Sequence, residues 1–105
     1  MNIIDNKALL LKAIDNYELI THNERLVLKT LVQIAVDNIA VINIKKLSEL
    51  TKVSRTLIYK AIDSFAQHGL VERGKSTRAS LSTFKLKPVN LENITKHYLA
   101  QKNIK

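Results

Sequence analysis

The sequence predicts one domain that is mainly α-helical and contains a small β-hairpin, which is an α+β fold. In several segments apolar residues recur every three or four positions, as they do on a helix with one buried face. Towards the C-terminus, short apolar runs at residues 70–73 and 81–86 flank a polar, basic stretch, as strands flank a turn. The length of 105 residues, without an internal repeat, supports a single compact core over residues 1–105.

The first half of the chain is expected to form two helices and a strand. Apolar residues at helical spacing predict the first helix over residues 1–20. Thr21 can cap a second helix, and Glu24 occupies the reciprocal position of a capping box. The apolar face of this helix extends to about residues 37–38. A short run of β-branched residues then predicts a strand over 40–44.

The second half is expected to form two more helices, the hairpin and a last helix. Ser54 can cap the longer of the two helices, and Gly69 is the residue type that ends helices in a left-handed conformation. Pro88 is expected to close the hairpin. The predicted helices cover 45–51, 54–69 and 91–103, and the strands cover 70–73 and 81–86. A central unit over residues 22–87 therefore lies between two added terminal helices.

The positive charge is concentrated in one part of the chain. The sequence has 17 Lys and Arg against 9 Asp and Glu, a formal net charge of +8. Between residues 45 and 87 there are ten cations and three acids, so this stretch carries +7. A concentrated positive field favours a polyanion through counterion release and electrostatic steering. The alternative is a lysine-rich surface that is only solvated.

Several function classes lack the residues they need. The absence of cysteine removes disulfides, thiol catalysis and cysteine-ligated metals, and it fits a reducing compartment. Two isolated glycines cannot build a phosphate-binding loop, and His22, His68 and His97 fall in separate elements. No apolar segment reaches the length of a membrane span, and the N-terminus lacks a secretory pattern. We therefore expect a soluble, cytoplasmic protein with no enzymatic activity, no cofactor, no metal and no membrane partner.

Residues 47–60 carry a resemblance to a known family. This stretch, with Val53-Ser54-Arg55-Thr56 as turn and cap, resembles the helix-turn-helix of winged-helix bacterial regulators, notably the MarR and GntR groups. Residues 61–74 are similar to the end of their recognition helix and their first wing strand. The similarity covers residues 40–87. Ser48 stands where these families usually have alanine, and Lys52 where they commonly have glycine. If Lys52 is left-handed, its side chain costs about 1 kcal/mol relative to glycine.

The resemblance implies that the helix over 54–69 enters the major groove of double-stranded DNA and that the hairpin is the wing. Arg55 and Lys60 can reach guanine O6 and N7 or a phosphate. Thr56 and Leu57 can touch thymine methyl groups, and Tyr59 can bond a phosphate. The wing would follow the backbone or enter a minor groove. The candidate DNA-binding residues are Lys45, Lys46, Ser54, Arg55, Thr56, Leu57, Tyr59, Lys60, Arg73, Lys75, Ser76, Thr77 and Arg78.

A purely structural interpretation exists for each of these residues. Ser54 is a plausible helix cap and nothing more, Arg55 and Lys60 are plausible solvated charges, and Tyr59 is a plausible packed aromatic. Some winged helices bind only other proteins. The positive charge that the helix over 54–69 shares with the hairpin favours DNA over that alternative.

The leading hypothesis is a sequence-specific regulator that represses transcription by occupying an operator as a homodimer. In the resembling families, terminal helices often build such a dimer, and their apolar stripes here are expected to exceed what the core absorbs. The alternative is a plasmid or phage protein for DNA segregation or replication initiation, with a filament-forming or replication partner. The layout is similar to small winged-helix adaptors that couple a centromere to a tubulin-like filament. The sequence shows no second domain for sensing a signal and is rich in Ile, Asn and Lys, which keeps this alternative open.

Overall fold

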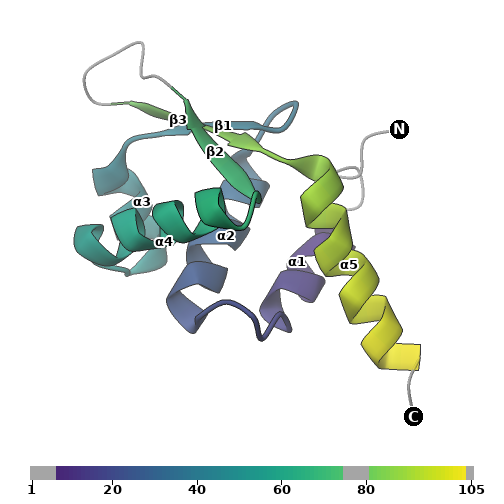
Figure 1. The fold of residues 1–105 in the computed structure, drawn as a ribbon. Coiled ribbons are helices and arrows are strands. Elements are labelled where there is room, and N and C mark those ends of the chain that lie inside the picture. Colours follow the sequence, from purple (N-terminus) through teal and green to yellow (C-terminus); the bar gives the residue numbers. More distant parts are fainter. Residues whose placement is uncertain (1–6, 75–80, 104–105) are drawn as a thin grey trace.

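The computed structural model describes residues 7–74 and 81–103. Five helices and three strands lie within these residues, in the predicted order (Figure 1). The helices are α1 (Lys7–Asp15), α2 (His22–Ile34), α3 (Ile44–Thr51), α4 (Arg55–Gln67) and α5 (Pro88–Asn103). The strands are β1 (Ile39–Ile42), β2 (Val71–Gly74) and β3 (Ser82–Leu86). The mainly α-helical fold with a small β-hairpin is therefore confirmed.

The strands form one antiparallel sheet in the order β1-β3-β2. The central strand β3 pairs with both neighbours, so that Phe84 lies opposite Ala40 of β1 and Arg73 of β2. Figure 1 shows α3 and the start of α4 at one end of the molecule, and α1 with α5 at the other end. Strand β2 runs from the end of α4 back towards α3. The hairpin and the α3–α4 pair therefore share one end of the molecule.

One apolar core joins all five helices to the sheet. Its largest fully buried side chains include Phe65 of α4, Phe84 of β3 and Leu28 of α2. The terminal helices contribute as fully, because Leu10 of α1 and Leu91 of α5 are also buried. Burying an aliphatic or aromatic side chain of this size contributes about 1.5–3 kcal/mol each. The terminal helices are thus part of the same core as the central unit.

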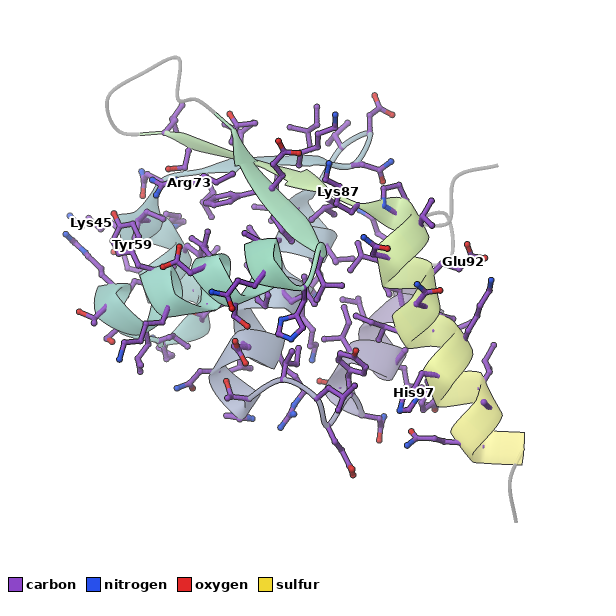
Figure 2. All side chains as sticks on the ribbon, viewed as in Figure 1. Lys45, Tyr59, Arg73, Lys87, Glu92 and His97 are labelled. Atoms are coloured by element: carbon purple, nitrogen blue, oxygen red, sulfur yellow. The ribbon has the colours of Figure 1, made fainter. Side chains whose placement is uncertain are left out.

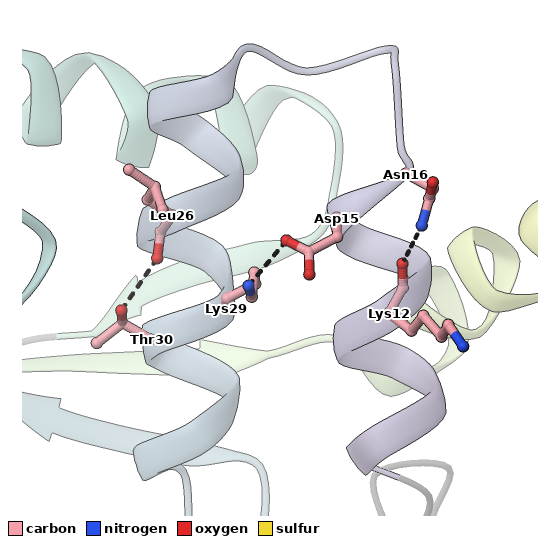
Figure 3. A network of polar contacts seen from close by, with 6 residues as sticks. All are labelled: Lys12, Asp15, Asn16, Leu26, Lys29 and Thr30. Carbon is pink, nitrogen blue, oxygen red and sulfur yellow. Dashed lines mark hydrogen bonds and ion pairs between the residues drawn. The ribbon is translucent and has the colours of Figure 1, made fainter.

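Helix α1 ends at Asp15, and the prediction that it continues to residue 20 is wrong. The side chain of Asn16 turns back, and its Nδ2 donates a hydrogen bond of 2.9 Å to the Lys12 carbonyl (Figure 3). Residues 1–6 of the predicted helix lie outside the described residues.

An arginine from the next helix bonds two carbonyl groups of the segment between α1 and α2. Arg25 Nη1 donates to the Tyr17 carbonyl at 3.0 Å and to the Ile20 carbonyl at 2.7 Å. A guanidinium has several fixed donors, so one side chain can satisfy both groups. The helical spacing of apolar residues continues past Asp15, but this tertiary contact overrides it.

Polar contacts also fix α1 against α2. Lys29 of α2 forms an ion pair of 2.8 Å with Asp15, the last residue of α1 (Figure 3). At the opposite end of the pair, Lys7 Nζ donates to the Ala35 carbonyl at 3.2 Å, beyond the end of α2. A cation is favourable there because the last carbonyl groups of a helix lack internal partners.

The predicted capping box of α2 is confirmed. The Glu24 N–H donates to Thr21 Oγ1 at 3.1 Å, and the Thr21 N–H donates to Glu24 Oε1 at 2.7 Å. The helix stops at Ile34, however, before the predicted end near residues 37–38.

A tight turn follows α2 in place of the predicted last helical turn. Asp37 and Asn38 both have positive φ, of 51° and 68°. The backbone groups of Val36 and Ile39 bond each other in both directions, at 2.9 and 3.0 Å. This is the two-residue geometry that matches the twist of paired strands, and Asn and Asp tolerate it better than most residues.

Two other boundaries differ from the prediction because of local capping. Asn43 was expected in the strand over 40–44, but its Oδ1 accepts a hydrogen bond of 2.6 Å from the Lys46 N–H and caps α3. Strand β1 therefore ends at Ile42. The last helix begins at Pro88 rather than at residue 91, because proline fits the first helical position, where no N–H partner is needed.

Candidate DNA interface

The predicted helix-turn-helix is formed by α3, a short turn and α4. Ser54 caps α4 by accepting a hydrogen bond of 3.3 Å from the Leu57 N–H, as expected. Gly69 has a φ of +69°, and the Leu70 N–H reaches back to the Phe65 carbonyl at 2.8 Å. These contacts are those of a helix that ends in a left-handed residue. The predicted cap at Ser54 and the predicted left-handed Gly69 are confirmed, and the helix between them covers Arg55–Gln67 rather than 54–69.

The two departures from the resembling families have structural explanations. Lys52 is left-handed, with φ 61° and ψ 22°, so it adopts the backbone that glycine would favour. Ser48 Oγ donates a hydrogen bond of 2.6 Å to the Val53 carbonyl. This bond joins α3 to the turn and gives the serine a role that alanine could not have.

Helix α4 presents its faces as predicted. The side chains turned to the core are those of Ile58, Ala61, Ile62 and Phe65. The side chains exposed to solvent include those of Arg55, Thr56, Tyr59, Lys60, Asp63 and Gln67. Leu57 is 39% exposed and borders a shallow hollow between α4 and the start of α2. An exposed leucine on a helix of this length is suited to an apolar contact in the major groove.

The cations on α3, on α4 and in the turn between them have no acidic partner among the described residues. Lys45 and Lys46 extend from the first turn of α3 and are exposed, as are Lys52, Arg55 and Lys60. Among the described residues, none of these five forms an ion pair. Figure 2 shows Lys45, Tyr59 and Arg73 at one end of the molecule, away from Glu92 and His97. Unpaired cations close to one another produce the field that attracts a phosphate backbone.

Tyr59 and Arg73 meet between α4 and the end of β2 that is farther from Gly69. The Arg73 guanidinium carbon lies 5.5 Å from the centroid of the Tyr59 ring, and Arg73 Nη2 donates to Ser82 Oγ at 3.1 Å. Ser82 is only 6% exposed. Tyr59 and Arg73 were predicted to lie in the interface, whereas Ser82 was not. The alternation along β3 was the available signal, because it places Ser82 on the same inward face as Phe84.

The positive charge of Lys87 is offset by an acidic neighbour. Its Nζ forms an ion pair of 2.7 Å with Glu72. The hydrogen bond and the charge of Lys87 hold the pKa of Glu72 below its ordinary value of 4.5. Lys75, Ser76, Thr77 and Arg78, the predicted wing contacts, lie outside the described residues.

A carboxylate lies close to α4 on the side of α2. Burial acts to raise the pKa of Glu24, but hydrogen bonds from Ser64 and Thr21 and the charge of His68 outweigh it. The pKa of Glu24 is therefore below its ordinary value of 4.5. His68 Nδ1 lies 2.8 Å from the Ser64 carbonyl at the end of α4, so the ring caps the helix.

The described part of the chain holds neither a metal-binding cluster nor a membrane-spanning helix. Residues 7–74 and 81–103 contain no group of three or more His, Cys, Asp or Glu side chains that could hold a metal ion. In that part of the chain, no helix combines the length and the apolarity needed to cross a membrane. His97 packs edge-on against the Tyr17 ring, with the ring centroids 5.9 Å apart.

No protein-family model and no curated protein sequence matches the chain. Solved structures do match. The structure of NadR in complex with 4-hydroxyphenylacetate has a TM-score of 0.59 at 16% identity, covering 93% of this chain and 70% of that one. A possible transcriptional regulator from Methanosarcina mazei has a TM-score of 0.58 at 12% identity, covering 90% and 77%. The ST1889 protein from Sulfolobus tokodaii has a TM-score of 0.57 at 20% identity, covering 99% and 97%.

The chain has a winged-helix fold. The fold expected from residues 40–87 is confirmed, and one of these neighbours is named as a possible transcriptional regulator. At these identities the likeness establishes the fold alone. In the winged helix, α4 occupies the place of the recognition helix and β2–β3 the place of the wing strands.

Proposed function

We propose that the protein is a sequence-specific double-stranded DNA-binding regulator that represses transcription by occupying an operator. The observation that carries this proposal is the set of five exposed cations on α3, on α4 and in the turn between them, which form no ion pair among the described residues. They lie in a fold that is shared with a possible transcriptional regulator. A protein surface with unpaired positive charges binds a polyanion favourably, because the polyanion releases its counterions on binding.

In this proposal α4 lies in the major groove. Arg55 and Lys60 bond guanine edges or phosphates, while Thr56 and Leu57 contact thymine methyl groups. Ser54 stands at the helix start, where free N–H groups favour a phosphate. The two lysines that begin α3, Lys45 and Lys46, neutralise phosphates beside the groove, and the wing residues Lys75, Ser76, Thr77 and Arg78 follow the backbone.

We also propose that the protein binds DNA as a homodimer, with the terminal helices in contact. The structure leaves less apolar surface for this contact than the sequence predicted, because Ile94 and Tyr98 are absorbed by the core. What supports the dimer is the remaining apolar surface on the terminal helices, which on α5 includes Val89, 73% exposed, and Leu99, 40% exposed. Light scattering coupled to size-exclusion chromatography tests this. Leu99→Asp is expected to convert a dimer into a monomer.

The function is tested by capture sequencing of source-genome fragments, including any plasmids, retained by the purified protein near physiological salt. Isolated inverted repeats ahead of genes are the result expected for a repressor. A dense array of short repeats would instead indicate a segregation or replication-initiation protein. Retention without sequence preference would overturn the proposal and favour a winged helix that binds another protein.

The proposed contact of Arg55 with a base is tested by a pair of variants. Arg55→Ala is expected to relax the base preference at one position of the site, at a cost of about 1–3 kcal/mol for the preferred sequence. Lys75→Ala is expected to weaken all sequences similarly. The two variants together separate base reading from backbone contact.

A further inference from the structure

We propose that Arg73 is a positioning residue that fixes the wing at a set angle to the recognition helix, and that it is not a phosphate ligand. This inference rests on the proposed DNA-binding function. It gives Tyr59 and Arg73 a role different from the direct contacts expected from the sequence. The observation behind it is that one guanidinium joins three elements: the Tyr59 ring of α4, Arg73 itself on β2, and the Ser82 hydroxyl of β3.

The position of this contact gives it leverage. Helix α4 and strand β2 are joined at a corner at Gly69 and diverge from there (Figure 1). Tyr59 precedes the last residue of α4, Gln67, by eight positions, which is about 12 Å along the helix axis. Arg73 lies near the far end of β2 and next to Gly74, where the wing segment begins. A contact so far from the corner restrains the angle between helix and wing more than contacts at the corner do.

An arginine suits both parts of this contact. A planar guanidinium can lie over an aromatic ring and donate a directed hydrogen bond at the same time. Ser82 is nearly buried, so its hydroxyl needs a partner, and the Arg73 Nη2 group supplies it. A lysine ammonium would keep the charge but has no plane to stack. Arg73→Lys therefore keeps the positive charge of this side chain and removes its planar group.

The contact leaves the Tyr59 hydroxyl without a part in holding the wing. The ring alone faces the Arg73 guanidinium, and the Tyr59 side chain is 45% exposed. Tyr59→Phe keeps the ring and removes the hydroxyl, whereas Tyr59→Leu removes the ring. This matched pair separates a positioning ring from a hydroxyl that binds phosphate.

The test measures affinity for a captured duplex over a range of salt concentrations. The proteins compared are the parent and its Arg73→Ala, Arg73→Lys, Tyr59→Phe and Tyr59→Leu variants, each checked for folding by circular dichroism. Lys46→Ala serves as the control for a lost phosphate contact, with an expected decrease of about one in the salt slope.

If Arg73 positions the wing, Arg73→Ala and Tyr59→Leu each weaken binding by about fivefold to tenfold with the salt slope of the parent. Arg73→Lys does not restore affinity, Tyr59→Phe binds like the parent, and the Arg73→Ala/Tyr59→Leu double variant is no weaker than either single variant. A salt slope lowered by about one in Arg73→Ala, with recovery in Arg73→Lys, would overturn the inference. A parent that binds no duplex would instead overturn the proposed function itself.

Discussion

The two ends of the molecule use their cations differently. At the end formed by α1 and α5, Lys29 pairs with Asp15 at 2.8 Å, Lys96 approaches Glu92 at 3.9 Å, and Lys7 bonds the carbonyl groups at the end of α2. At the end formed by α3 and α4, the five exposed cations have no acidic partner among the described residues. The positive charge of the first end serves the fold, and that of the second end remains available to a ligand.

The two ends do not differ in how well they are packed. Ile94 of α5 and Ile58 of α4 are both buried in the same core. A functional end of a protein is often described by its looser packing, but here the distinction is electrostatic. The unpaired charge of the α3–α4 end therefore lies on helices that are packed into the same core as α5.

The largest expected effect concerns the packing of the α1–α5 end. Ile94→Ala is expected to lower the free energy of unfolding by about 2–5 kcal/mol, because it removes a fully buried side chain. Urea unfolding measures this. Leu99→Ala, on the same helix but 40% exposed, is the control and is expected to change stability by less than about 0.5 kcal/mol. Equal effects would show that α5 is not anchored through the face described.

The charge difference between the ends predicts a difference in DNA affinity. The Lys45→Ala/Lys46→Ala variant is expected to bind DNA roughly thirtyfold more weakly at about 0.15 M salt, since each lost phosphate contact costs about fivefold there. Lys12→Ala/Lys96→Ala removes the same charge from the other end and is expected to stay within about twofold. Fluorescence anisotropy with a labelled duplex measures both. Similar losses would mean that binding follows net charge and not its placement.

A smaller effect is expected at Gly69, which lies between α4 and β2. At Gly69 an added Cβ would lie 2.9 Å from Asn90 Nδ2, and the φ of +69° disfavours any side chain. Gly69→Ala is expected to cost about 1–2 kcal/mol. Gly74→Ala places its Cβ in ordinary contact, 3.5 Å from Thr83, and is expected to be close to neutral. Thermal unfolding distinguishes them, and equal melting temperatures would contradict the strain assigned to Gly69.

The smallest expected effect concerns pH. Because the pKa of Glu24 is lower in the folded state, its ionised form adds stability above about pH 4.5, and this is lost as the pH falls through the folded pKa. Glu24→Gln keeps the capping-box acceptor and removes the charge. It is expected to be less stable than the parent at pH 7 by only a few tenths of a kcal/mol, because solvent screens the site. Unfolding curves at pH 7 and at about pH 3 should show the difference only at pH 7.

Sequence predicted those features that adjacent residues decide. The capping box of Thr21 and Glu24, the Ser54 cap and the left-handed Gly69 each depend on groups within a few positions. The exposed face of α4 followed from helical periodicity alone. These local rules were sufficient to place the candidate recognition helix.

The features that sequence did not predict depend on residues distant in the chain or on unusual turns. Helix α1 ends early because Arg25 bonds carbonyl groups as many as eight positions before it. The turn at Asp37 and Asn38 has positive φ at both residues without a glycine, so its usual signal was absent. The contact of Tyr59 with Arg73 and Ser82 requires the sheet to be folded onto α4, which no local pattern encodes.

The pairing of β1 with β3 has a consequence for how the protein opens. Ile42 lies opposite Ser82, so this ladder closes a loop that encloses all of α3 and α4. Forming such a distant pairing is slow and comes at an entropic cost, but once formed it ties the enclosed helices to the sheet. The amide protons of α4 should therefore exchange with solvent only when β1 separates from β3. The surface proposed to read DNA would then be among the last parts of the molecule to lose its shape.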